Sequence, residues 1–334
     1  MMKNKLLGAI CAVALGLAAS AASAQQQFVM KLSSPTVNDI AHEWMKAFKA
    51  GVEQRSNNRI KVEIYPANQL GQIPATVEGV AMGTIEFAVP AVGFFVGLEP
   101  RFQVFDIMGL YDDMAHAARV FQDPEVRKML ATFGQSKGVE PLYVLPHGPL
   151  GVVSHKAIRS VADFKGQKLR MPGGAPVQVE PFRKLGVSPL SIPLGEVLPA
   201  MQNKTIDGAI ISIAVFAGQK YYDVAKPMTM LPGSFLTVGG VVNRDFMKSI
   251  GPELEKIVRE ESQKAELAVV SWGVEDAARA SETWKKNGGE VITLADTKLF
   301  QDEVASVLPT IFANNARLKQ DYDILVEAAK RQRK

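Results

Sequence analysis

The apolar positions of the chain switch repeatedly between two periods from residue 28 onward. Alternation at every second residue is typical of a half-buried strand, and recurrence at every third or fourth residue is typical of an amphipathic helix. Residues 28–32 and 60–64 show the first pattern, and residues 40–52 between them show the second. Strands that alternate with helices in this way predict an α/β fold.

The same alternation continues through the second half of the chain, which indicates two lobes of comparable size. Further strands are predicted at residues 85–89, 142–145, 150–153, 167–171 and 206–211, and further helices at residues 75–82, 176–185 and 196–202.

The longest helical pattern begins at Pro252 and runs until Gly288 and Gly289 end it. A helix of roughly 35 residues spans about 50 Å, at 1.5 Å per residue. That length exceeds what one lobe needs, so we expect this helix to brace both lobes. The alternative is a pair of helices broken near Gly273.

The first 24 residues have the pattern of an export signal. Lys3 and Lys5 precede an apolar stretch at residues 6–17, and Ala22-Ser23-Ala24 forms a cleavage site. This segment predicts a periplasmic protein. It also holds the only cysteine, Cys11, so cleavage leaves no thiol for catalysis, metal binding or disulfide formation.

Composition argues against several other classes of function. Two of the four net positive charges come from the export segment, and the nearly neutral remainder does not favour nucleic-acid binding. Beyond that segment no run of 18 uncharged apolar residues offers a membrane helix.

Motifs of nucleophile elbows, phosphate-binding loops and zinc-binding helices are missing, and the four histidines are scattered. We therefore expect no enzyme activity, no metal and no cofactor. A carboxylate pair assembled by the fold would escape this search, so a periplasmic enzyme stays open as an alternative.

Four stretches form an ordered set of motifs: residues 65–71 (YPANQLG), 80–87 (VAMGTIEF), 161–172 (VADFKGQKLRMP) and 193–208 (PLGEVLPAMQNKTIDG). In order and spacing they resemble the solute-binding receptors of tripartite ATP-independent periplasmic (TRAP) transporters, the DctP-like family. The resemblance implies two α/β lobes joined by crossing strands, with a long helix shared between them. It also implies closure over a small organic acid that is delivered to the membrane permease subunits, with peripheral contact to inner-membrane proteins only.

On this basis lobe I is expected at residues 25–147 plus about 236–275, and lobe II at 148–235 plus about 276–334. A ligand-sensing module for a membrane sensor, built from the same two lobes, is a further alternative.

Arg170 is the leading candidate for holding the acid. Its neighbours Leu169 and Met171 alternate with Lys168 and Arg170, which places Arg170 at the carboxyl end of a strand, where α/β sheets bind ligands. A guanidinium stays charged and holds a carboxylate through two parallel N–H bonds. Each such bond contributes about 1.5 to 3 kcal/mol, whereas micromolar affinity requires about 8 kcal/mol. Arg170 therefore anchors the ligand but cannot suffice.

Departures from the family pattern all replace polar residues by apolar ones. Leu150 stands where many members carry a second arginine, and Ile211 stands where an asparagine often follows. The polar candidates that remain beside Arg170 are Ser34, Gln69, His147 and Ser212, and the expected apolar walls are Phe94, Phe95, Leu150, Leu194 and Ile211.

One cation among apolar walls suits an acid with a single carboxylate and an apolar body. We expect an aromatic or branched hydrophobic monocarboxylate, because a second carboxylate would be buried without a partner. A C4-dicarboxylate or a sugar acid is the alternative, and Phe94 and Phe95 are ordinary core residues if the prediction fails. His147 is expected to meet a ring hydroxyl or the carboxylate, unless it is only a loop residue.

Overall fold

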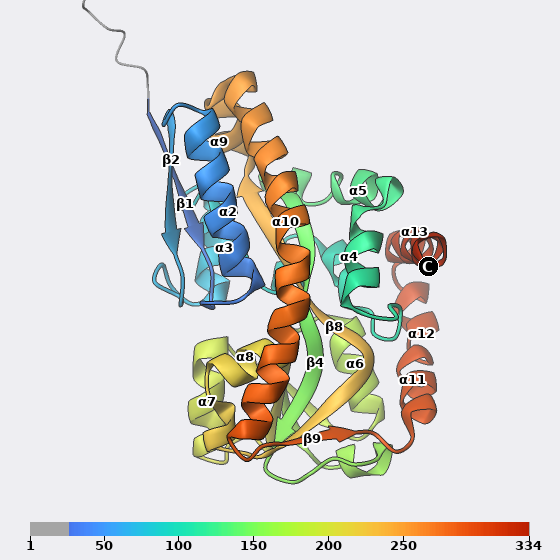
Figure 1. The fold of residues 1–334 in the computed structure, drawn as a ribbon. Coiled ribbons are helices and arrows are strands. Elements are labelled where there is room, and N and C mark those ends of the chain that lie inside the picture. The colour runs from blue at the N-terminus through green and yellow to red at the C-terminus, as the bar shows by residue number, and fades with distance from the viewer. Residues whose placement is uncertain (1–26, 334) are drawn as a thin grey trace, which may run out of the picture.

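The computed structural model describes residues 27–333, so the predicted export signal and Cys11 lie outside the described residues. A mixed sheet in the order β2-β1-β3-β8-β4-β7-β5-β6, with β9 beside β8, runs through the molecule. Helices cover it in an upper and a lower lobe, as Figure 1 shows. The predicted α/β class and two-lobed architecture are confirmed.

The upper lobe is built on three parallel strands, β1 (Phe28–Ser33), β2 (Ile60–Tyr65) and β3 (Phe87–Ala88). Helix α2 (Ile40–Arg55) starts at Asp39, whose carboxylate accepts the backbone N–H of His42 at 3.0 Å. Its apolar face buries Trp44, which stacks on Phe87. α3 (Ile73–Met82) follows β2, and β3 is shorter than the strand predicted at residues 85–89.

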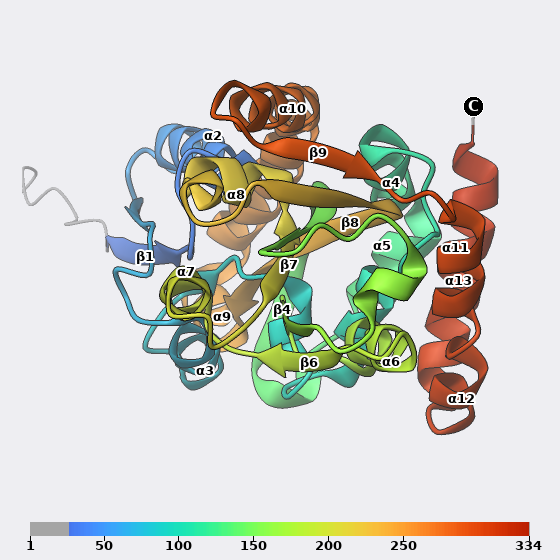
Figure 2. The same cartoon turned by 90° about the horizontal axis from the view of Figure 1, so that it is seen from below.

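The lower lobe is built on β5 (Lys168–Met171), β6 (Ser188–Ser191) and β7 (Gly208–Ser212). β5 lies between β6 and β7 and is parallel to both. The helices α6 (Pro176–Lys184), α7 (Leu194–Gln202) and α8 (Ile213–Gly218) connect and cover these strands. Seen from below, α7 and α8 lie on one side of β4 and α6 lies on the other (Figure 2).

Two long antiparallel strands cross from one lobe to the other, β4 (Val139–Ser154) and β8 (Pro227–Asn243). The prediction of separate strands at residues 142–145 and 150–153 is wrong, because β4 is continuous through Pro146 and Pro149. Shifts of register between Pro146 and Gly148 and between Pro149 and Gly151 absorb the prolines. These irregular positions lie where the two lobes meet.

The predicted long helix is α10, which extends from Gly251 to Lys286 as one element along both lobes (Figure 1). The alternative of a break near Gly273 is therefore wrong. A Cβ at Gly273 would lie 2.5 Å from the Cδ1 of Ile40 and 2.8 Å from the Cε of Met114. Glycine thus serves the close approach of α2 and of α4 (Met114–Gln122) to α10.

The chain ends with β9 (Glu290–Thr293) and three helices, α11 (Thr297–Ala305), α12 (Leu308–Ala313) and α13 (Ala316–Gln332). α13 packs on α4, α5 (Pro124–Leu130) and η2 (Pro100–Asp106), all of which precede β4. The domain boundaries predicted above assign α13 to lobe II and these partners to lobe I, and they remain a prediction.

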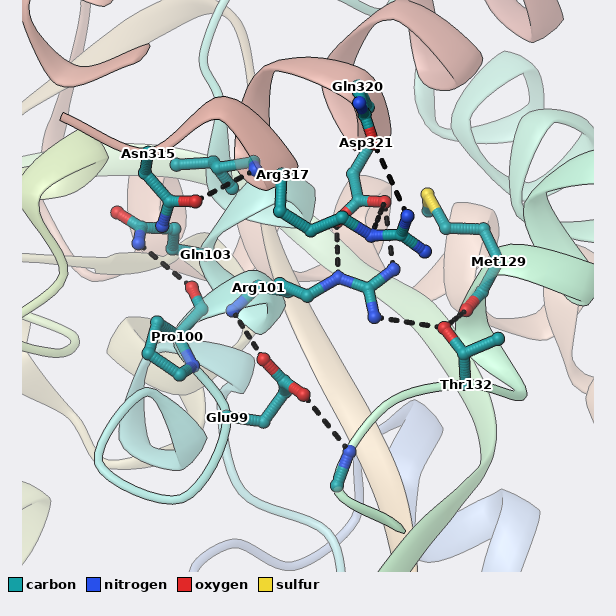
Figure 3. A network of polar contacts seen from close by, with 12 residues as sticks. Glu99, Pro100, Arg101, Gln103, Met129, Thr132, Asn315, Arg317, Gln320 and Asp321 are labelled. Carbon is teal, nitrogen blue, oxygen red and sulfur yellow. Dashed lines mark hydrogen bonds and ion pairs between the residues drawn. The ribbon is translucent and has the colours of Figure 1, made fainter. Parts of the chain in front are cut away.

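A buried ion pair fixes α13 in this position. The Arg101 guanidinium donates from Nε and Nη2 to the two carboxylate oxygens of Asp321, at 2.5 and 2.8 Å, and from Nη1 to Thr132 (Figure 3). Arg101 also lies over the ring of Phe133, 4.1 Å from its centroid.

Across residues 27–333, no helix combines the length and the apolar character that crossing a membrane demands.

Candidate ligand-binding site

A narrow cavity lies where the two lobes meet the crossing strands. Its volume is about 30 Å³, which is enough to hold water but is far below the roughly 150 Å³ of a cavity that binds benzene. Polar side chains come only from Thr36, His147 and Arg170, and the other lining residues are Pro35, Ile73, Val89, Ala91, Phe94, Pro172, Leu194, Ile211, Val215, Leu236 and Val238. The cavity is therefore almost entirely apolar, with one permanent cation in its wall.

Arg170 comes from β5, the inner strand of the lower lobe, and is 2% exposed. Its Nε donates to the carbonyl of Ile192 at 3.2 Å. Within residues 27–333 no carboxylate lies within ion-pair distance of its guanidinium. Burial lowers the pKa of Arg170 to about 10, so the side chain remains charged at neutral pH. The site thus contains a buried cation whose counter-ion the described residues do not supply.

Tyr221 lies near this cation. Its hydroxyl is buried without a hydrogen-bond partner among the described residues, and burial raises its pKa to about 12. A neutral phenol beside Arg170 offers a dipole but no compensating charge.

His147 connects the two lobes through its ring. Nε2 lies 3.0 Å from Oδ2 of Asp39 at the start of α2, and Nδ1 lies 2.8 Å from Oγ of Ser212 at the end of β7. Burial raises the pKa of Asp39, but the charge and hydrogen bonds of His147 and its neighbours outweigh that effect and hold it at about 2. Because Asp39 is ionised, Nε2 of His147 carries the hydrogen that is donated to its carboxylate.

Five of the residues predicted from the sequence line the cavity: Arg170, His147, Phe94, Leu194 and Ile211. Two other predicted residues do not line the cavity but bond to residues that do. Ser34 bonds the Thr36 backbone N–H at 3.3 Å, and Ser212 bonds His147.

The structure does not bring the remaining predicted residues to the cavity. Gln69 is exposed in the turn after β2. Leu150 is buried in an apolar cluster with Val152, Leu169 and Met171 and does not line the cavity. Phe95 packs on Phe102 in the core, with ring centroids 5.1 Å apart.

Sequence reasoning missed Thr36 and the two residues of β8, Leu236 and Val238, which line the cavity, and Asp39, which bonds His147. An Asn-Asp pair before an apolar helical pattern is a signal for a helix start, and it would have drawn attention to Asp39. The pairing of Asp39 with His147 has no such signal, because 108 residues separate them. β8 was missed because Pro232 and Gly233 interrupt its apolar pattern.

A cavity at the junction of two lobes, crossed by strands and a shared helix, defines a two-lobed binding protein that encloses a small molecule. The chain belongs to the family "Bacterial extracellular solute-binding protein, family 7" (DctP), whose model matches residues 33–315. Members of this family are periplasmic substrate-binding receptors, not enzymes. The resemblance inferred from the four motifs is confirmed.

Two curated relatives are similar over most of the chain. The 2,3-diketo-L-gulonate-binding periplasmic protein YiaO of Escherichia coli is 27% identical over 86% of this chain and 87% of its own. The C4-dicarboxylate-binding periplasmic protein DctP of Rhodobacter capsulatus is 25% identical over 95% of this chain and 100% of its own.

Among solved structures, a TRAP periplasmic solute-binding protein from Desulfovibrio salexigens with bound orotic acid has a TM-score of 0.86. It is 24% identical and covers 92% of this chain and 100% of its own. The fold is thus shared with TRAP receptors, whose ligands differ from one protein to the next.

Proposed function

We propose that this chain is the periplasmic receptor of a TRAP transporter. It captures a small hydrophobic monocarboxylate, aromatic or branched, and delivers it to the membrane permease subunits. The family supports the receptor role, and the export signal predicted at residues 1–24 supports the compartment.

The observation that carries this proposal is the buried Arg170 without a counter-ion in an apolar cavity. An ion removed from water costs several kcal/mol unless an opposite charge compensates it. The carboxylate of a ligand supplies that charge through two parallel hydrogen bonds. A second carboxylate would face apolar residues such as Phe94 and Leu194, so dicarboxylates are disfavoured by the same penalty.

Binding requires the lobes to move. The cavity volume of about 30 Å³ is much smaller than an aromatic acid. The crossing strands β4 and β8 and the helix α10 connect the lobes, and the irregular register of β4 near Pro146 and Pro149 is a suitable hinge. The ligand is expected to hold the lobes around itself at a wider separation than in the present conformation.

A thermal-shift panel of aromatic, branched, dicarboxylic and sugar acids tests the proposal. A ligand at 100 times its Kd stabilises the folded state by about 2.7 kcal/mol. We expect aromatic or branched monocarboxylates to raise the Tm of the wild type and to have no effect on Arg170→Met. Arg183 is exposed and paired with Glu180, so Arg183→Met is the matched control and should retain the full shift.

Two outcomes contradict the proposal. If dicarboxylates raise the Tm and aromatic acids do not, the ligand class is wrong. If Arg170→Met retains the shift, the anchoring role of Arg170 is wrong.

The chain of hydrogen bonds from Asp39 through His147 to Ser212 contains the residue types of a hydrolase triad. Ser212 is fully buried and does not line the cavity, so its hydroxyl cannot reach a bound carbonyl in this conformation. We therefore propose that these hydrogen bonds position the ring of His147. Recovery of unchanged ligand after prolonged incubation is expected, and a chemically altered product would show that the protein is an enzyme.

A further inference from the structure

A second, larger cavity adjoins the Arg170 cavity. It has a volume of about 500 Å³ and shares Pro35, Thr36 and Val215 with the smaller one. These three residues form the boundary between the two cavities, so an acid anchored at Arg170 and longer than the Arg170 cavity reaches past them. We call the larger cavity the outer chamber.

The walls of the outer chamber come from both lobes and from α10. Asn38 and Asp39 belong to the upper lobe, Val215 and Gln219 follow β7 in the lower lobe, and Asp276 and Arg279 belong to α10. α8 packs directly against α10 in this region (Figure 1). A molecule in the chamber therefore touches both lobes at once.

The outer chamber, unlike the surroundings of Arg170, is lined by two carboxylates, Asp39 and Asp276, together with one cation, Arg279. Arg279 lies over the ring of Trp272 at 5.1 Å and bonds Glu275 and Asp276 only weakly, at 3.4 and 3.3 Å. Asp39 is buried and already bonded to His147. Asp276 is thus the carboxylate that remains accessible, with a side chain that is 19% exposed.

The surroundings of Asp276 favour a cationic partner. Burial raises its pKa, and the negative charge of Asp39 adds to that effect, while Arg279 and His147 oppose it. An ammonium group brought close by a ligand would compensate this carboxylate more directly than the long contact from Arg279 does.

We propose that the outer chamber is the second half of the ligand site. Asp276 selects acids whose end remote from the carboxylate carries an ammonium group or another hydrogen-bond donor. This inference rests on the proposed function, because the carboxylate end of the ligand is the end held by Arg170.

Three acids with the same ring and different remote groups test it: benzoate, 4-(aminomethyl)benzoate and terephthalate. Titration calorimetry on the wild type is expected to give at least tenfold tighter binding of 4-(aminomethyl)benzoate than of benzoate, with terephthalate weakest. In Asp276→Asn the ratio between the first two should fall to near one. Glu282 is on the same helix, is exposed and does not line the chamber, so Glu282→Gln should keep the wild-type ratio.

The outcomes separate this inference from the function it rests on. Equal binding of benzoate and 4-(aminomethyl)benzoate by the wild type overturns the role of the chamber, while the receptor proposal stands. Persistence of the preference in Asp276→Asn overturns the role of Asp276. If none of the three acids binds, this inference fails and the aromatic half of the proposed ligand class fails with it, while the thermal-shift panel decides on the branched acids. The wild-type ratio decides the matter even if the variant does not fold.

Discussion

Replacement of Arg170 by methionine should make the ligand-free protein more stable while abolishing carboxylate binding. The pKa of Arg170 falls from its ordinary value of 12.5 to about 10 because the side chain is buried. At about 1.4 kcal/mol for each pH unit, this displacement corresponds to about 3 kcal/mol lost by the folded protein. Because the folded pKa is the lower one, the unfolded chain binds more protons between pH 10 and 12.5, and the loss is fully present at every pH below 10.

Methionine fills a similar volume without the charge. It also removes the hydrogen bond from Nε to the carbonyl of Ile192, which costs about 1 kcal/mol. The net gain is therefore about 2 kcal/mol, which corresponds to a Tm higher by about 4 °C for a protein of this size.

The measurement is urea unfolding at pH 7, after unfolding and refolding of both proteins to remove any bound solute. Arg170→Met should show a higher midpoint with an unchanged slope. The control Arg183→Met should change stability by less than about 0.5 kcal/mol, as exposed positions do. A clear loss of stability in Arg170→Met would refute the reasoning, because it would mean that the protein itself compensates the cation.

Two further predictions concern the contact between the lobes. A Cβ at Gly173 would lie 3.0 Å from the backbone of Gly93 across the lobe boundary, whereas one at Gly174 would have no neighbour within 4 Å. Gly173→Ala should therefore push the lobes apart towards the wider separation that the ligand needs, so ligand binding should become no weaker and the radius of gyration of the ligand-free protein in X-ray scattering should increase. Gly174→Ala should change neither ligand binding nor the radius of gyration. Equal effects of the two variants would refute the idea that a methyl group at residue 173 forces the lobes apart. Asp39→Asn keeps the helix cap but loses the ionised carboxylate. The pKa of Asp39 is about 2 in the folded protein against its ordinary 3.8, so the ionised carboxylate stabilises the fold by about 2 kcal/mol above pH 4. This stabilisation is lost as the pH falls towards 2. Urea unfolding between pH 3 and pH 7 should show that the free energy of unfolding falls less steeply towards acid pH in this variant than in the cap variant Asp113→Asn. The same pH dependence in both variants would contradict the role of Asp39.

The sequence pattern predicted most of the regular elements because their apolar periodicity is local. α2, β2, α10 and β5 lie close to where the pattern places them. The crossing strands were harder to predict, because β4 and β8 contain prolines and glycines that usually end a strand. Their continuity depends on pairing with each other over many residues, with shifts of register that no local pattern reveals.

The candidate site was predictable only in part. Arg170 was placed correctly at a strand end because the alternation around it and the adjoining Pro172-Gly173-Gly174 are local signals. Leu150 was expected in the wall and packs instead in an apolar cluster with Leu169 and Met171, in a part of β4 whose shifts of register no local pattern reveals. The pairing of His147 with Asp39 depends on how two lobes meet, which is a tertiary property.

Within residues 27–333 the chain passes between the two lobes in four places: along β4, along β8, along α10, and on the way from α11 to α13. The last of these passages is anchored by the buried pair of Arg101 and Asp321. Relative movement of the lobes has to bend all four connections together, so rotation is permitted while wide separation is resisted. A protease that cuts any one of them leaves the two halves joined by the other three.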